Sequence, residues 1–166
     1  MKERRVFKKG KFVLTRRGNV VINLSKRIVT KLKPYCRRIK VVGSIRRKEK
    51  NPIDIDIVLI PKSREKMEER MKKLGRYIQG GEHESTWKVE GVNIELYYTN
   101  SEEWGAALLA YSSEFGAGIG LRVIAKKKGF KLNNHGLFKG NQRIAGKTER
   151  EIYSALGRSY KEPWER

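Results

Sequence analysis

Residues 41–57 read Val-Val-Gly-Ser-Ile-Arg-Arg-Lys-Glu-Lys-Asn-Pro-Ile-Asp-Ile-Asp-Ile, and the end of this stretch predicts a strand. β-Branched residues dominate Ile53–Ile60, and Pro61 ends the run. Side chains of a strand alternate between two faces, so Asp54 and Asp56 share one face while the isoleucines enter a core on the other. Two like charges on one face are costly without a cation, and hard carboxylate oxygens favour Mg²⁺ or Mn²⁺. An exposed strand edge can also carry such a pair, so Asp-x-Asp alone does not establish a metal site.

A third carboxylate follows on a later strand. Glu90-Gly91 is a two-residue hairpin signal between the predicted strands Ser85–Val89 and Val92–Tyr98. Apolar residues alternate along the second of these strands, and Glu95 points to the opposite face. Glu95 is therefore available to the same site as the two aspartates.

A Gly-Ser pair, Gly43-Ser44, precedes the aspartates and follows a predicted strand, Ile39–Val42. This order of strand, Gly-Ser, short helix and carboxylate strand resembles the nucleotidyltransferase superfamily. The resemblance implies that Gly43 lets the backbone approach a phosphate closely, and that the Ser44 hydroxyl and nearby amides bind triphosphate oxygens. It also implies that Arg47 neutralises the leaving pyrophosphate. An ordinary turn followed by solvated arginines is the alternative interpretation.

Flanking patterns predict two lobes. Residues 1–21 are interpreted as a basic β-ribbon with turns at Lys9-Gly10 and Arg17-Gly18-Asn19. Apolar spacing predicts helices over 23–32 and 64–77, the second ending near Gly80-Gly81. After residue 100 the pattern becomes helical over 102–109 and again through Lys128, with a glycine-rich stretch at 116–120 between them. Thr148-Glu-Arg-Glu151 is a capping box that opens a last short helix, which closes at Gly157.

The second lobe narrows the family. Its motifs are Trp104-Gly-Ala-Ala-Leu-Leu109, Ala125-Lys-Lys-Lys-Gly-Phe-Lys-Leu-Asn133, Gly136-Leu-Phe138 and Thr148–Gly157. They resemble the C-terminal part of family X DNA polymerases, the polymerase beta group, and the resemblance covers roughly residues 22–166. It implies an α+β fold, with a palm over 1–100 whose mixed sheet carries helices on one face. A small helical subdomain with a short antiparallel sheet, which closes on nucleotide and template, is expected over 101–166, as in reduced family members without a lyase domain.

Site residues can be carried over position by position. Asp54 and Asp56 match the carboxylates that bind both of two Mg²⁺ or Mn²⁺ ions, and Glu95 stands where the family has the Asp that binds the catalytic metal. Glutamate is one methylene longer, so the metal spacing can shift. The resemblance also places Arg122 near the template strand. It makes Lys126, Lys127 and Lys128 a cluster that faces DNA phosphates.

Departures from the family lie at the nucleotide pocket. Where the family has Tyr-Phe-Thr-Gly-Ser, this chain has Ala110-Tyr111-Ser112-Ser113-Glu114, and Gly118 replaces an Asn that faces the incoming base. Tyr111, Ser112 and Gly118 are the expected nucleotide-binding residues here. The changes relax exclusion of a 2′-hydroxyl unless the Tyr111 ring fills the vacated space. Three glycines, Gly116, Gly118 and Gly120, either loosen this segment before substrate binds or only permit close packing.

Charge identifies the partner class. The chain has 39 Lys and Arg against 18 Asp and Glu, a net charge of +21, and residues 1–50 alone carry 19 basic and 2 acidic side chains. Such a concentration of positive charge favours a polyanion, and DNA as primed or gapped duplex is the expected partner, together with nucleoside triphosphates. No apolar run is long enough to span a membrane. Cys36, the one cysteine, is interpreted as a packing residue. A monomer is expected, intracellular and either cytoplasmic or nucleoid-associated.

Three functions remain to be separated. The leading hypothesis is a template-directed DNA polymerase for gap filling or repair synthesis. The second is a template-independent or ribonucleotide-tolerant nucleotidyltransferase, and the third is a non-catalytic nucleic-acid-binding protein. His135, beside Asn133-Asn134, is interpreted as a turn residue and not as a catalyst.

Overall fold

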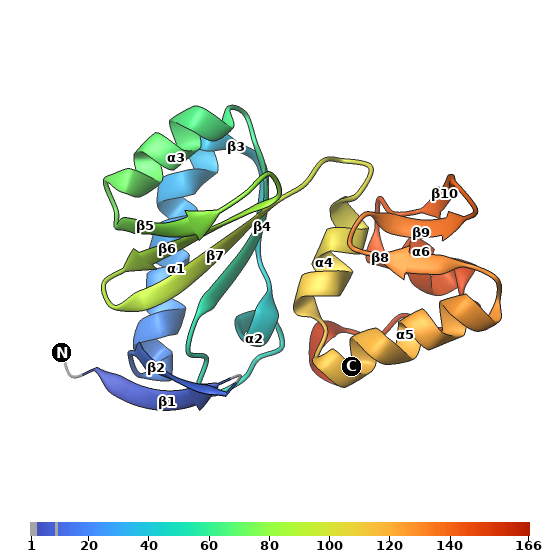
Figure 1. The fold of residues 1–166 in the computed structure, drawn as a ribbon, viewed down its shortest axis with the longest axis horizontal. Helices are drawn as coiled ribbons and strands as arrows, with labels where there is room; N and C mark the ends of the chain where they lie inside the picture. The colour runs from blue at the N-terminus through green and yellow to red at the C-terminus, as the bar shows by residue number, and fades with distance from the viewer. Residues whose placement is uncertain (1–2, 9) are drawn as a thin grey trace. The chain divides into compact units, whose positions relative to one another are not determined.

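A mixed five-stranded sheet forms the centre of the N-terminal part of the chain (Figure 1). Its strands, in spatial order, are β3 (Cys36–Val41), β4 (Ile55–Pro61), β7 (Val92–Tyr98), β6 (Glu84–Val89) and β5 (Arg76–Gly80). The central pair, β4 and β7, is parallel, and the other pairs are antiparallel. This computed structural model describes residues 3–8 and 10–166 and divides into two units, Met1–Tyr98 and Thr99–Arg166.

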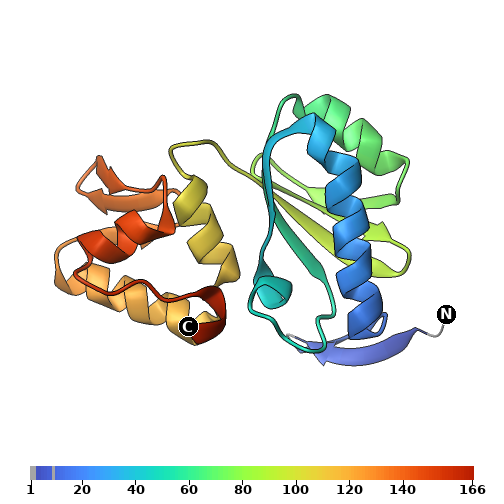
Figure 2. The same ribbon diagram turned by 180° about the vertical axis from the view of Figure 1, so that it is seen from behind.

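Helices α1 (Gly18–Leu32) and α3 (Arg64–Lys72) lie on one face of this sheet, as Figure 2 shows from behind. Their apolar side chains meet those of the central strands in one buried cluster. The fully buried members include Leu24, Ile28, Leu32, Ile55, Ile57, Leu59, Met67, Met71, Ile94 and Leu96. Alternation along β4 and β7 therefore leaves the opposite face of the sheet for polar side chains.

Several boundaries differ from the sequence-based prediction; β3, for example, begins at Cys36 and not at Ile39, and helix α4 (Trp104–Ser112) extends to Ser112. Helix α3 ends at Lys72, and residues 76–80, which were expected in the helix, form edge strand β5. Their backbone pairs with β6, and the Tyr77 ring packs edge-to-face on Trp87, with ring centroids 5.2 Å apart. Helix α1 begins at Gly18, where a turn was expected, and gains a turn before the predicted start. Strand β4 begins at Ile55, which leaves Asp54 in a bend just ahead of the strand.

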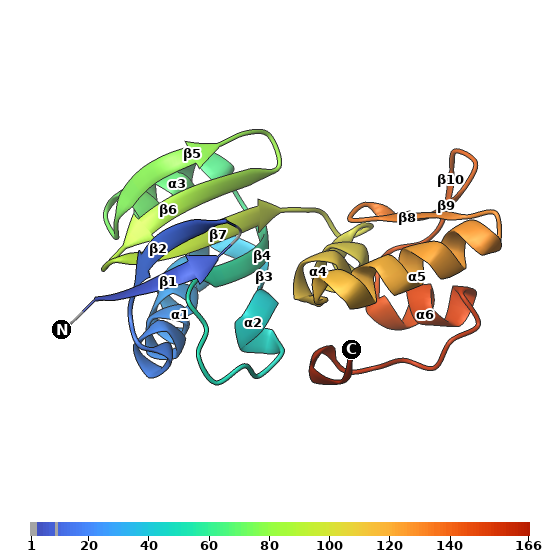
Figure 3. The same ribbon diagram turned by 60° about the horizontal axis from the view of Figure 1, so that its bottom comes forward.

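Strands β1 (Arg4–Lys8) and β2 (Lys11–Thr15) form the predicted N-terminal ribbon and lie side by side (Figure 3). The ribbon is tied to the segment that leads into Asp54: the Arg4 guanidinium donates to the carbonyls of Asn51 and Pro52, and the Thr15 hydroxyl donates to the carbonyl of Ile53. Lys9, part of the expected turn, lies outside the described residues. Helix α2 (Gly43–Arg46) is the short helix after the Gly-Ser pair, and η1 (Lys33–Tyr35) links α1 to β3.

The second unit is mainly helical. It consists of α4 (Trp104–Ser112), α5 (Phe115–Lys127), α6 (Glu149–Ala155) and η2 (Pro163–Glu165), with a three-stranded antiparallel sheet of β8 (Lys131–Asn133), β9 (Gly136–Lys139) and β10 (Gln142–Ala145). Leu109, Ala125, Leu137 and Ile152 are buried in its core. The predicted capping box of α6 is confirmed, since Thr148 and Glu151 each bond the other's backbone amide.

The α+β fold class predicted from the sequence is confirmed. The glycines at 116, 118 and 120 are helical within α5. Cys36 is buried, in agreement with a packing role, and burial raises the pKa of its thiol to about 11. Among the described helices, none has the length and apolar character to cross a membrane.

Candidate active site

Two carboxylates lie directly opposite each other on the polar face of the sheet. Asp56 of β4 and Glu95 of β7 are register partners in a parallel pair, so their side chains project from the same face. The Tyr97 hydroxyl lies between them, donating to Glu95 Oε2 and approaching Asp56 Oδ1 at 3.4 Å. The third carboxylate, Asp54, is two residues ahead of Asp56 in the bend before β4.

The environment of this carboxylate cluster disfavours ionisation of its central residue, Asp56. Burial raises the pKa of Asp56 to about 7, and the negative charges of Asp54 and Glu95 add to that increase. Lys8 and the Tyr97 hydroxyl act in the opposite direction. A buried carboxyl among like charges is the environment that a divalent cation relieves.

Lys8, at the end of β1, supplies the positive charge next to these carboxylates. Its Nζ lies 2.6 Å from Asp54 Oδ2. Burial alone would lower the pKa of this ammonium, but the hydrogen bond to Asp54 and the charges of Asp54, Asp56 and Glu95 raise it above its ordinary value. The sequence analysis missed Lys8, because its role depends on the docking of the ribbon and not on a local motif.

The Gly-Ser pair closes the other side of the site. The Val42 amide donates to the carbonyl of Asp56 at 2.8 Å, which places the start of α2 against β4. Gly43 has φ +62°, and a Cβ there would lie 2.1 Å from Asp56 Oδ2, so only glycine fits. The Ser44 hydroxyl is buried and has no hydrogen-bond partner among the described residues. A buried hydroxyl of this kind is suited to an incoming polar ligand.

Arg47 lies at the end of the same short helix. Its guanidinium donates to Glu49 Oε1 from Nε at 3.0 Å and from Nη2 at 2.5 Å. The Arg47 side chain is mostly buried, whereas Glu49 is more exposed. A phosphate at this position would compete with the Glu49 carboxylate for the guanidinium.

The donor set fits divalent metal ions in its chemistry, since it offers carboxylate oxygens around an Asp56 that is costly to ionise. As arranged, however, no group of three or more His, Cys, Asp or Glu side chains within residues 3–8 and 10–166 has the geometry to hold an ion. Lys8 engages Asp54, and Tyr97 engages Glu95. A metal ion at these residues would compete with Lys8 for Asp54 and with Tyr97 for Glu95.

The remaining candidate residues belong to the second unit. Tyr111 and Ser112 end α4, and Gly118 and Arg122 are one turn apart on α5, where they line a small cavity together with Ala110 and Ser113. This cavity thus brings two residues of the segment that departs from the family, Ala110 and Ser113, together with Gly118, the position expected to face the base. Lys126, Lys127 and Lys128, at the end of α5, are all exposed to solvent.

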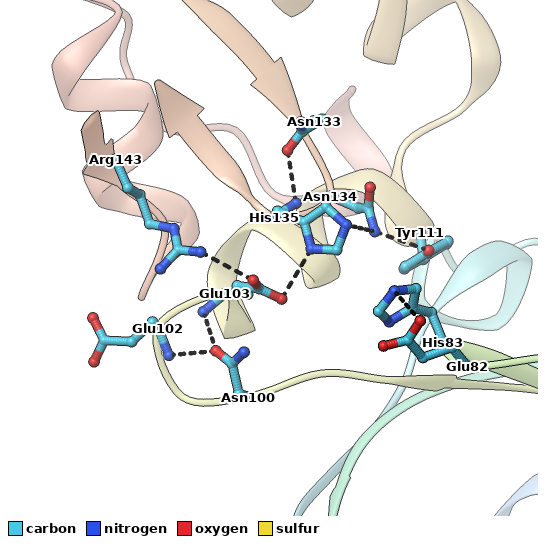
Figure 4. A network of polar contacts seen from close by, with 10 residues as sticks. All are labelled: Glu82, His83, Asn100, Glu102, Glu103, Tyr111, Asn133, Asn134, His135 and Arg143. Atoms are coloured by element: carbon cyan, nitrogen blue, oxygen red, sulfur yellow. Dashed lines mark hydrogen bonds and ion pairs between the residues drawn. The ribbon is translucent and has the colours of Figure 1, made fainter. Parts of the chain in front are cut away.

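A polar network lies beside Tyr111 (Figure 4). Glu103 accepts from Arg143 Nη2 at 2.9 Å and lies 3.0 Å from His135 Nδ1. The neighbouring Asn134 amide donates to the Tyr111 hydroxyl at 3.4 Å. His135 is in the turn between β8 and β9, as predicted, but the role of Glu103 in holding this turn was missed, because the two residues are 32 positions apart.

Known proteins similar to this chain are named as DNA polymerases or as DNA nucleotidylexotransferases. Residues 118–166 match the family described as DNA polymerase beta thumb. Over 147 residues the chain is 31% identical to the repair DNA polymerase X of African swine fever virus. This aligned region covers 81% of this chain and 84% of the viral protein. It is 33% identical to DNA polymerase IV of Saccharomyces cerevisiae over 42% of this chain and 12% of the yeast protein. It is 35% identical to DNA nucleotidylexotransferase of Gallus gallus over 48% of this chain and 16% of the chicken protein. The chain therefore belongs to the family X DNA polymerases and is a nucleotidyltransferase.

Proposed function

We propose that this protein is a template-directed DNA polymerase that extends a 3′ end in gap filling or repair synthesis. The observation that carries the proposal is the meeting of Asp56 and Glu95 on adjacent strands, with Asp54 and the Gly43-Ser44 turn beside them. The viral relative that the chain matches over most of its length is a repair DNA polymerase by name. The first unit is the proposed palm, and the second is the proposed subdomain for nucleotide and template.

Divalent metal ions serve family X DNA polymerases in general. Here Asp54 and Asp56 would hold two Mg²⁺ or Mn²⁺ ions, and Glu95 would hold the one nearer the attacking 3′-oxygen. When bound, such ions neutralise charge on the phosphoryl group and favour the alkoxide form of the 3′-hydroxyl. The fit rests on the raised pKa of Asp56, which burial causes first and the negative charges of Asp54 and Glu95 increase, even with Lys8 present.

The residues around the carboxylates have separate roles in binding the triphosphate. Gly43 has no side chain, so the backbone of the turn is open to a phosphate beside Asp56. The unpartnered Ser44 hydroxyl would donate to a triphosphate oxygen. The Arg47 guanidinium would exchange Glu49 for the pyrophosphate and neutralise it as it leaves.

A second candidate function is template-independent addition. The similarity to a DNA nucleotidylexotransferase and the altered Ala110–Glu114 segment favour this alternative. The Asn134 amide donates a hydrogen bond to the Tyr111 hydroxyl, which gives the ring a defined position at the C-terminal end of α4. We expect weaker selection of dNTP over rNTP than in a relative with the intact aromatic pair, because a lost steric barrier to the 2′-hydroxyl costs selectivity directly.

Primer extension tests the proposal. Four dNTPs and four rNTPs are supplied separately with Mg²⁺ or Mn²⁺ on single-stranded, primed and gapped DNA. We expect incorporation opposite a template base, with no extension of the single strand and a gapped duplex as the best substrate. Extension that ignores the template supports the second function, and no incorporation on any substrate with either metal contradicts both. The efficiencies for dGTP and GTP, with Tyr111→Ala for comparison, measure sugar selection.

A further inference from the structure

The two faces of the β1–β2 ribbon differ sharply in burial. In its antiparallel register Phe7 pairs with Phe12, and Arg5 pairs with Leu14. These four residues project outward, and Phe7, Phe12 and Leu14 are 63%, 60% and 53% exposed. The alternate residues of both strands lie on the inner face, where Lys8 is half-buried and Thr15 is buried, and only Lys11, beside the turn, is exposed among the described ones. The ribbon therefore docks by one face and presents an apolar, aromatic surface on the other.

The outward rings have a defined geometry. Phe7 and Phe12 are packed edge-to-face, with centroids 5.1 Å apart and planes at 67°. The Arg5 guanidinium carbon lies 4.3 Å from the centroid of Phe12, a cation–π contact. Large exposed apolar groups gathered on a folded surface mark an interaction site.

The ribbon that carries these rings is anchored along its length. Besides the bonds to Asn51, Pro52 and Ile53, Arg16 donates to the carbonyl of Glu90 at 3.0 Å. Lys88 Nζ donates to the carbonyl of Leu14 at 3.1 Å. Because these bonds already hold the ribbon in place, binding of a ligand to the exposed rings costs little additional conformational entropy.

We propose that the outer face of this ribbon is a stacking platform for unpaired bases of single-stranded DNA, such as the template strand beside a gap. The proposal rests on the DNA polymerase function proposed above. Aromatic rings beside cations are the combination with which proteins bind single strands irrespective of sequence, because every base offers a π-face and every linkage a phosphate.

Charge favours DNA over a second copy of the chain as the partner of this face. In the described ribbon segments, residues 3–8 and 10–17, the exposed cations are Arg5, Lys11 and Arg17, and the one acidic residue is Glu3. Arg4, Lys8 and Arg16 are half-buried and bonded to the rest of the unit. In a symmetric contact, a second copy of the chain would bring the same positive surface against this one, which is repulsive. A DNA strand brings phosphates to the cations and bases to the rings.

The test separates base stacking from phosphate binding. An oligothymidylate and an abasic deoxyribose-phosphate strand of equal length and charge are bound in the absence of metal and nucleotide, and fluorescence anisotropy gives both affinities. The wild-type protein should prefer the strand that has bases. Replacing both rings (Phe7→Leu with Phe12→Leu) should weaken oligothymidylate binding about tenfold and abolish the preference, without changing its salt dependence. Phe7→Tyr with Phe12→Tyr should restore the preference, which a merely unfolded ribbon would not.

Matched controls make each outcome decisive. Tyr77→Leu removes an exposed ring from edge strand β5 of the same unit and should leave the preference intact. Arg5→Gln with Lys11→Gln should weaken binding of the oligothymidylate and of the abasic strand alike, and should reduce the salt dependence of binding. An unchanged preference in the leucine variant overturns the inference, as does a wild-type dimer that this variant dissociates. Failure of the proposed polymerase function shows separately, as absence of nucleotide incorporation by a wild-type protein that still prefers bases.

Discussion

Asp56 is the residue whose environment makes the most direct prediction. Its pKa is raised to about 7 by burial and by Asp54 and Glu95, so the folded protein holds this proton more tightly than the unfolded chain. For such a group stability is fully present below the unfolded-state pKa, 3.8, and is lost as the pH rises through about 7. The metal-free protein is therefore expected to lose on the order of a few kcal/mol of unfolding free energy over this interval.

Asp56→Asn should remove that pH dependence, because an amide cannot ionise. In the absence of metal, we expect the variant to be more stable than wild type at pH values above about 7 and similar to it below about 4. Urea unfolding across the pH range measures both. Glu69→Gln, a change at an exposed carboxylate of α3, is the control and should follow wild type. A variant with the wild-type pH profile would show that Asp56 is not the destabilising group.

Lys8 is predicted to compete with the metal ions. In Lys8→Met the Asp54 carboxylate loses its partner at 2.6 Å, so the metal-free protein should be less stable by about 1 kcal/mol, since the ammonium is partly exposed. Mn²⁺ should bind several-fold more tightly, because the ion no longer displaces an ammonium. Calorimetric titration with Mn²⁺ measures this affinity, with Lys11→Met, a change at an exposed lysine of β2, as the control. Unchanged affinity and stability together would remove Lys8 from the site.

Individual site residues were predictable where a local pattern carries their chemistry. Strand alternation pointed to Asp54, Asp56 and Glu95, and the resemblance to nucleotidyltransferases added Gly43 and Ser44. The structure brings these five residues together. Lys8 and Glu103 could not be found in this way, because each meets its partner across a large sequence separation. Such contacts depend on register and docking, which single-sequence periodicity does not encode.

At the scale of elements, the helical stripe of α1 and the hairpin signal were read correctly, whereas the end of α3 was not. The core stripe of α1 and the hairpin of β6 and β7 were predicted, and the turn residues Glu90 and Gly91 both have positive φ, as a tight hairpin requires. Residues 76–80 were assigned to α3 because Ile78 extends its apolar spacing. Pairing with β6 outweighs that weak helical preference, since tertiary contacts override local propensity.

The ribbon is the element expected to contribute most to DNA binding through charge. Deleting residues 1–17 removes eight basic side chains and one acidic one, so affinity should fall for all duplex sequences alike. The slope of log affinity against log salt should decrease by roughly one unit for each phosphate that the segment contacts. Binding of primed duplex at several salt concentrations measures the slope for both forms. An unchanged slope would mean that the ribbon does not contact the DNA backbone.

For the whole molecule, the account assigns catalysis and DNA binding to different groups. The carboxylates lie in one small cluster of the first unit, whereas the excess of positive charge is spread over residues 1–50 and, more weakly, over residues 101–166. Removing one carboxylate should therefore abolish chemistry while leaving DNA affinity close to that of wild type. Mutation can abolish catalysis without weakening DNA binding only if the carboxylates and the basic residues act separately in this way.

The most direct test of that division is the rate of single-nucleotide insertion into a one-nucleotide gap by Asp56→Asn, with DNA and Mg²⁺ saturating. The account predicts a rate at least about a thousandfold below wild type, because loss of bound metal removes several kcal/mol of transition-state stabilisation. The same samples should bind the gapped duplex with near wild-type affinity. Insertion at close to the wild-type rate would contradict the assignment of the active site.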